Sequence, residues 1–191
     1  MTLQDAISDA MKAMWIAFML YWLVAARGAK PLRWREGWRG RALDTLLIVP
    51  ALLLPMPEHF WPAALNARFV PRGWTLPLLG NALEAAGLGF AVWARVHLGR
   101  EWSSVVALKQ DHRLIRSGPY GFLRHPIYSG VLFALLGTAL AIGAWRALLG
   151  VVCLAAAFLR RVAAEEKQLA QAFPDYAAYQ RETAALIPFL Y

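Results

Sequence analysis

The sequence has little cysteine and few charged residues, and both features limit the class of protein to which it can belong. Its single cysteine, Cys153, has no partner, which excludes a disulfide framework and a cysteine-based zinc cluster. It lies within an apolar run, where we expect it to pack. Charged residues make up 17% of the 191 residues and hydrophobic residues 59%, with a mean hydropathy of +0.42. A soluble domain of this size could not hide so much apolar sequence in one core, so we expect an integral membrane protein.

Glycine-rich turns after a strand, internal repeats and low-complexity linkers are also missing. Without such a turn there is no Rossmann dinucleotide fingerprint, and without a linker residues 1–191 are expected to form one membrane domain. A cleavable signal is not expected either, because Asp5 and Asp9 precede the first apolar run and basic residues follow it. We interpret that run as a retained anchor.

Apolar segments are abundant, and they predict an all-α, polytopic membrane protein with about five transmembrane helices. The segments are approximately Ala10–Ala26, Leu43–Pro57, Trp74–Leu98, Ile127–Trp145 and Ala147–Val162. The second contains three prolines, which would kink or end a helix. The last two are almost contiguous and predict a tight hairpin that turns near Trp145 and Arg146.

The net charge of +8 is distributed as in a membrane protein and not as in a nucleic-acid-binding protein. Sixteen of the 20 lysines and arginines fall in residues 27–41, 95–126 and the tail from residue 160. Short loops rich in these residues stay in the cytoplasm, so we expect the N-terminus outside and the C-terminus inside. The alanine, arginine and tryptophan content points to a bacterium, and we expect the protein in its inner membrane. Loop 99–126 and tail 163–191 then share the cytoplasmic side and can meet.

The loop before the fourth apolar segment gathers groups that can bind a ligand. It contains HRLIRSGPY at residues 112–120 and RHPIY at residues 124–128. A tight turn at Gly118-Pro119 and a helix start at Pro126 explain the glycine and the prolines. They do not explain the histidines, arginine and tyrosines. In the tail, Arg161 and Glu165 share a helical face, a spacing that by itself indicates an ion pair.

These motifs, taken in order, resemble one enzyme family. LGREWS at 98–103, GPY at 118–120, RHPIY at 124–128, Glu165-Glu166 and YAAY at 176–179 look like the isoprenylcysteine carboxyl methyltransferase family and its phospholipid methyltransferase relatives. The resemblance runs from about Trp93 to the end. It implies a catalytic module over residues 93–191, whereas residues 1–92 would form membrane helices that shape the acceptor entrance.

The resemblance also implies a cofactor, S-adenosyl-L-methionine, bound between the cytoplasmic loop, the last helical hairpin and the tail. Arg161 matches the arginine that faces the acceptor carboxylate and is the expected catalytic and substrate-binding residue. The residues expected to bind the cofactor are His112, Arg113, Leu114, Ile115, Tyr120, His125, Pro126, Ile127, Tyr128 and Glu165.

Chemistry agrees with this assignment. Glu165 can pair with the ammonium group of the cofactor, His125 can donate to its carboxylate, and tyrosine faces can contact its sulfonium. An acceptor carboxylate is already ionised at neutral pH and needs no general base. The expected partners are a lipophilic or lipidated acceptor and membrane lipid, with no nucleic acid and no metal.

Three other functions stay open at this stage. Methylation of a phospholipid amine or a small thiol would need a base, for which His112 or Glu166 is the candidate. A reductase similar to the sterol reductases would bind a nicotinamide cofactor, and a non-catalytic membrane adaptor would bind neither. Glu84 and Asn81, inside the third apolar segment, indicate either a buried hydrogen bond or the lining of a lipid tunnel.

Overall fold

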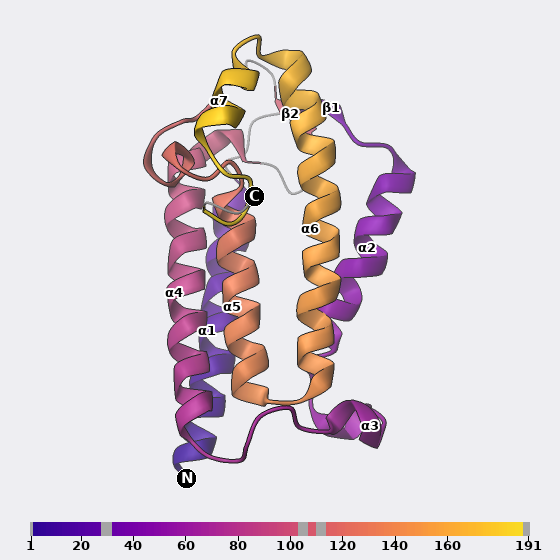
Figure 1. The fold of residues 1–191 in the computed structure, drawn as a ribbon, viewed down its shortest axis with the longest axis vertical. Coiled ribbons are helices and arrows are strands. Elements are labelled where there is room, and N and C mark those ends of the chain that lie inside the picture. Colours follow the sequence, from indigo (N-terminus) through magenta and orange to yellow (C-terminus); the bar gives the residue numbers. More distant parts are fainter. Residues whose placement is uncertain (1, 28–31, 103–106, 110–113, 189–191) are drawn as a thin grey trace.

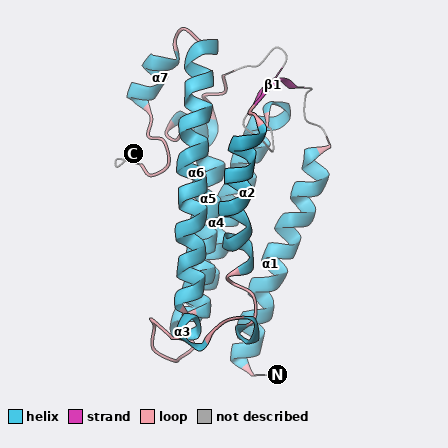
Figure 2. Cartoon of the chain, turned by 90° about the vertical axis from the view of Figure 1, so that its right-hand side faces the viewer, coloured by secondary structure: helices cyan, strands magenta, loops and turns pink. Residues whose placement is uncertain are grey.

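A computed structural model describes residues 2–27, 32–102, 107–109 and 114–188. Long helices lie side by side, and the chain reverses its direction from each to the next (Figures 1 and 2). The five longest within this described part are α1 (Leu3–Ala26), α2 (Trp38–Leu53), α4 (Thr75–Leu98), α5 (Pro126–Ile142) and α6 (Trp145–Ala172). The predicted helical membrane fold is thus confirmed.

Short elements occupy the two ends of the bundle. The N-terminus and α3 (Ala63–Asn66) lie at one end, and helix α7 of the tail (Tyr176–Glu182) lies at the other (Figure 1). Near α7, strand β1 (Leu32–Arg35) pairs antiparallel with β2 (Ala107–Lys109). This two-stranded sheet was not predicted, because strands of four and three residues are too short for hydrophobic alternation to reveal them.

The helix boundaries differ from the predicted segments where polar residues continue a helix. Helix α1 begins at Leu3, seven residues early, because Thr2 and Asp5 form a capping box. Helix α6 continues past Val162 to Ala172, through alanine, glutamate, lysine and glutamine, which favour helix without being apolar. The hairpin turns at Gly143, whose φ of 70° is left-handed, just before the predicted position.

Three helices among the described residues are long and apolar enough to cross a membrane: α1, α4 with its extension to Glu101, and α6. Helix α5 is apolar but has 17 residues, and α2 has 16 with Pro50 inside it. A 17-residue helix rises about 26 Å, somewhat less than the hydrocarbon core. Five crossings therefore stay a prediction, although the alternating directions of these helices agree with it.

Helices α4 and α5 approach each other through glycines. A Cβ atom added to Gly87 would lie 2.5 Å from the carbonyl oxygen of Gly130, and one added to Gly80 would lie 2.5 Å from that of Gly137. Small residues at regular spacing allow two backbones to pack closely within a membrane. This close pair fixes α5, and the first turn of α5 carries several of the predicted site residues.

Polar groups inside the bundle connect α1, α4 and α5. Glu84 is fully buried and accepts a hydrogen bond of 2.9 Å from Thr138, whose hydroxyl also accepts one from Trp15. Asn81 donates to the carbonyl oxygen of Ile7 at 2.7 Å. These contacts agree with the structural interpretation of Glu84 and Asn81, as buried hydrogen-bonding groups between helices.

Candidate active site

The tail folds back onto the loop that precedes α5. Leu123 and Ala184 form a parallel bridge, and the amides of Arg124 and His125 donate to the carbonyl oxygens of Ala184 and Ala185 at 2.9 and 3.1 Å. The loop and the tail therefore meet at the α7 end of the bundle (Figure 1). This contact brings the predicted motifs of the loop, α5 and α6 to one place.

Arg124 fastens this junction to α6. Its Nε donates to Glu166 Oε1 at 2.5 Å, and its Nη1 donates to the carbonyl oxygens of Gln180 and Thr183. The Gln180 side chain donates to the other oxygen of Glu166 at 2.9 Å. Sequence analysis gave Arg124 no role, since its partners lie more than forty residues away. Glu166 is thus part of a partly buried hydrogen-bonding network.

His125 lies between two carboxylates. Its Nδ1 is 3.3 Å from Glu165 Oε2 and its Nε2 is 3.4 Å from Glu166 Oε1, while its side chain is only 5% exposed. Burial alone would lower the pKa of the His125 imidazole. Hydrogen bonds and negative charge from Glu165 and Glu166 outweigh that effect and raise its pKa above the ordinary value. His125 therefore favours its protonated form.

Tyr128 completes a contact with Glu165 from the first turn of α5. Its hydroxyl donates to Glu165 Oε1 at 2.5 Å. Its ring stacks on His125 at 5.7 Å and on Phe158 of α6 at 4.4 Å between centroids. Pro126 begins α5 and removes an amide that would have no helical partner. Glu165, His125 and Tyr128 are thus brought together in space.

Other predicted residues pack nearby. Tyr120 and Ile127 belong to a buried cluster with Ala94 and Trp102, and Ile115 packs against it. Burial raises the pKa of the Tyr120 hydroxyl, which also feels the charge of Glu165. Leu114 is half-buried. The predictions for His112 and Arg113 lie outside the described residues.

Arg161 lies one helical turn before Glu165, and its Nε donates to Asp44 Oδ2 at 2.7 Å. It also interacts with the Tyr128 hydroxyl. Sequence analysis missed Asp44. Asp44 could have been found from its position, because an acidic residue within an apolar segment requires a charged or hydrogen-bonding partner.

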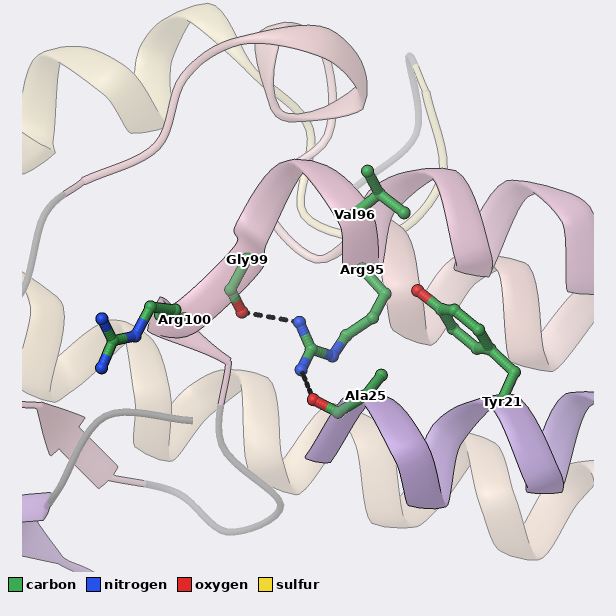
Figure 3. Close-up of a pocket in the computed structure, with 6 residues that line it drawn as sticks. All are labelled: Tyr21, Ala25, Arg95, Val96, Gly99 and Arg100. Carbon is green, nitrogen blue, oxygen red and sulfur yellow. Dashed lines mark hydrogen bonds between the residues drawn. The ribbon is translucent and has the colours of Figure 1, made fainter. Parts of the chain in front are cut away.

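A pocket lies between the ends of α1 and α4, and none of its lining residues is a predicted site residue (Figure 3). It is lined by Tyr21, Ala25, Arg95, Val96, Gly99 and Arg100. The Arg95 guanidinium donates to the carbonyl oxygens of Ala25 and Gly99, both at 2.6 Å, and lies 4.7 Å from the Trp102 ring centroid. Arg95 thus ties together the C-terminal ends of two helices, where a cation is favourable.

Metal-binding residues do not cluster in the part of the chain that the structure describes. Within those residues, no group of three or more histidine, cysteine, aspartate or glutamate side chains could hold a metal ion. Instead, His125 and the two carboxylates contact one another, and the carboxylates also bind Arg124 and Tyr128.

Comparison with known proteins identifies the family. The model of the isoprenylcysteine carboxyl methyltransferase family matches residues 75–171, about half of the chain. The cobalt-zinc-cadmium resistance protein CzcN of Cupriavidus metallidurans is 34% identical over 120 residues, which cover 61% of this chain and 52% of the relative. The protein-S-isoprenylcysteine O-methyltransferase of Schizosaccharomyces pombe is 35% identical over 101 residues, covering 51% and 43%. A probable protein-S-isoprenylcysteine O-methyltransferase of Oryza sativa subsp. indica is 28% identical over 173 residues, covering 81% and 85%.

The chain spans about half the length of the first two relatives, and with the rice relative the similarity extends over most of both chains. The family match covers α4, α5 and most of α6, the helices that carry Tyr128, Arg161 and Glu165. Together with the three helices able to cross a membrane, it identifies an integral membrane protein. The chain belongs to the isoprenylcysteine carboxyl methyltransferase family.

Proposed function

We propose that this protein transfers a methyl group from S-adenosylmethionine to the carboxylate of a lipophilic, isoprenylcysteine-like acceptor at a membrane. Membership of the family supports the reaction class. The observation that carries the proposal is the convergence of Glu165, His125 and Tyr128 one helical turn from Arg161. This arrangement provides an anionic group for a cofactor and a cationic group for an acceptor.

The residues around Glu165 fit the polar ends of S-adenosylmethionine. The Glu165 side chain is 23% exposed, and its oxygens can accept further hydrogen bonds, so it can bind the ammonium group. Among the described residues, the hydroxyl of Tyr176 is buried without a hydrogen bond, and such a group normally has a partner. It is available to the carboxylate or hydroxyl groups of a cofactor. When bound, S-adenosylmethionine supplies a methyl group on a positively charged sulfur.

The remaining predicted cofactor residues have two roles in this proposal. Tyr128 and Tyr120 supply aromatic faces, which attract a sulfonium. Leu114, Ile115, Pro126 and Ile127 supply apolar packing that excludes water, and His112 and Arg113 complete the set from the loop. Excluding water strengthens the contacts of Glu165 with a charged ligand.

The contacts of Glu166 argue against its acting as a base for an amine or thiol acceptor, and the other candidate base, His112, lies outside the described residues. An amine or thiol acceptor must lose a proton, and Glu166 is a candidate base. Glu166 binds Arg124 and Gln180 instead, which stabilises its charged form and makes it a poor proton acceptor. A carboxylate is ionised at neutral pH and needs no base. Arg161 can hold it through two N–H groups and align an oxygen with the methyl carbon.

We further propose that the site faces the cytoplasm of a bacterium and that the N-terminus lies outside. The proposed site is at the α7 end of the bundle, and the N-terminus is at the opposite end (Figure 1). Sixteen of the 20 lysines and arginines fall in residues 27–41, 95–126 and 160–191, segments whose described parts lie toward the α7 end. This distribution supports a cytoplasmic location for that end. The alanine, arginine and tryptophan content supports a bacterial source.

The test uses the full chain purified in detergent. Isothermal calorimetry with S-adenosylmethionine and, separately, NADPH distinguishes a methyltransferase from a reductase. A methyl-labelled donor is then offered with N-acetyl-S-farnesylcysteine, phosphatidylethanolamine or a small alkyl thiol. We expect binding of S-adenosylmethionine and transfer to the farnesylcysteine acid. Binding of NADPH alone, or transfer only to the amine or the thiol, would contradict the proposal.

A further inference from the structure

A cluster of four charged side chains joins the start of α2 to α6 close to the proposed site. We name it the α2–α6 charge cluster, and it consists of Glu36, Asp44, Arg160 and Arg161. Its two carboxylates balance its two guanidinium groups. The family match begins at residue 75, so the acidic half of the cluster comes from outside the matched region.

Asp44 is the centre of this cluster. It is 4% exposed, and both of its oxygens are engaged: Oδ1 accepts from Arg160 and Oδ2 accepts from the Nε of Arg161 at 2.7 Å. A buried carboxylate is costly unless its oxygens are paired. Asp44 therefore fixes the direction in which these two neighbouring guanidinium groups lie.

The two arginines differ in how they are held. Glu36 accepts from two nitrogens of Arg160, at 2.8 and 3.1 Å, and Asp44 accepts from its Nε at 2.7 Å. Arg160 is thus fixed by two carboxylates. Arg161 forms an ion pair with Asp44 and also interacts with the Tyr128 hydroxyl. Arg161 therefore connects α2 with the Tyr128–Glu165 contact.

We infer that Asp44 is a positioning residue for methyl transfer, which acts by orienting the guanidinium of Arg161 toward the acceptor carboxylate. The inference rests on the proposed function, in which Arg161 binds that carboxylate. A contact at Nε sets the plane of the guanidinium, and the plane sets where a two-pronged hold can form. The N-terminal half of the chain then contributes to catalysis as well as to the membrane anchor.

Charge balance within the cluster gives Asp44 a second effect on the same step. Without Asp44, the positive charge of Arg161 would be less balanced, and it would neutralise an acceptor carboxylate more tightly. A tightly neutralised oxygen is a weaker nucleophile toward the methyl carbon. By sharing the charge, Asp44 lets Arg161 orient the acceptor while the acceptor oxygen stays reactive.

The test compares substitutions that differ in whether they reach Arg161. Asp44→Asn removes a charged partner of both Arg160 and Arg161, whereas Glu36→Gln removes a charged partner of Arg160 and leaves the Asp44–Arg161 pair in place. We would measure kcat and KM for N-acetyl-S-farnesylcysteine, the calorimetric affinity for S-adenosylmethionine, and the melting temperature of each full-length variant. A double variant combines Asp44→Asn with Arg161→Ala. If Asp44→Asn alone does not fold, a second double variant, Asp44→Asn with Arg160→Gln, takes its place, because it keeps the charge of the cluster balanced.

We expect Asp44→Asn, or its charge-balanced replacement, to reduce kcat/KM for the acceptor by about 100-fold, as a misplaced reacting group can. Cofactor affinity should stay at the wild-type value, and Glu36→Gln should transfer methyl at nearly the wild-type rate despite a lower melting temperature. In the Arg161→Ala background, Asp44→Asn should cause no further loss, because both act through one contact.

Two results would overturn the role of Asp44 while leaving the proposed function intact. One is that Asp44→Asn and Glu36→Gln both lose methyl transfer, and that each loss follows the fall in melting temperature of that variant. The other is an additive loss in the Arg161→Ala background. A wild-type protein that methylates no carboxylate acceptor would instead contradict the proposed function, and the positioning role with it.

Discussion

At the scale of single residues, the proposed site separates cofactor binding from acceptor binding on one helix. Arg161 and Glu165 are four residues apart on α6, the spacing of a simple surface ion pair. The structure gives them different partners: Arg161 contacts Asp44, and Glu165 contacts Tyr128 and His125. Their substitutions should therefore have separable effects.

We predict that Glu165→Gln weakens S-adenosylmethionine binding by about 10- to 100-fold, because one charged hydrogen-bond partner of the ammonium is lost. Arg161→Ala should leave that affinity unchanged and reduce methyl transfer by about 100-fold or more. Calorimetry and initial rates measure the two quantities, with the exposed Lys167→Gln on the same helix as control. Equal behaviour of all three variants would show that neither residue belongs to the site.

The protonation of His125 gives a prediction about pH. Its raised folded-state pKa means that the folded protein holds the proton more tightly than the unfolded chain, whose ordinary value is 6.5. The stabilisation is therefore complete below that ordinary value and is lost as pH rises through the higher folded-state value. The difference in melting temperature between wild type and His125→Gln should shrink as pH rises above about 6.5. A difference that stays constant or grows with pH would indicate a neutral His125.

At the scale of elements, the close approach of α4 and α5 supports the site by fixing the first turn of α5. We predict that Gly87→Ala destabilises the protein by about 1–3 kcal/mol, as overpacking does, because the new Cβ would meet the backbone of Gly130 and Ala134 at 2.5 Å. Gly89→Ala is the matched control on the same helix, where a Cβ meets nothing within 4 Å. It should be neutral or slightly stabilising, because alanine favours helix. Equal melting temperatures of these two variants in detergent would contradict the close packing.

The helices were largely predictable, and the way they pair was only partly so. Periodic apolar runs, Pro126 and the turn near Trp145 located α4, α5 and the final hairpin within a few residues. The continuation of α6 beyond Glu165 to Ala172 was not predicted, because the predicted helices were located by their apolar residues and this stretch is polar. Its residues nevertheless favour helix. The distribution of lysine and arginine correctly predicted that the loop before α5 and the C-terminal tail lie on the same side and can meet. The Asp44–Arg161 contact spans 117 residues, and no local pattern encodes such a distance.

At the scale of the whole molecule, membrane orientation decides whether the proposed site can reach a cytoplasmic acceptor. Two exposed glycines offer a matched pair of probes: Gly37 precedes α2 at the α7 end of the bundle, and Gly73 precedes α4 at the other end. An added Cβ atom meets nothing within 4 Å at either position, and neither replacement alters the distribution of lysine and arginine. Both probes therefore report orientation without disturbing the signal that sets it.

We predict that, in a background with Cys153→Ala, Gly73→Cys reacts with a membrane-impermeant thiol reagent in intact bacterial cells. Gly37→Cys should react only after the cells are permeabilised. This pattern follows if the ends of the bundle lie on opposite sides of the membrane and the basic end faces the cytoplasm. If neither cysteine reacts with the reagent in intact cells, both lie on the same side of the membrane. Helix α2 and residues 54–74 are the chain between them, so α2 would then not cross the membrane. The reverse pattern would turn the Glu165–Arg161 site outward, away from any cytoplasmic supply of S-adenosylmethionine, and would contradict the proposed function itself.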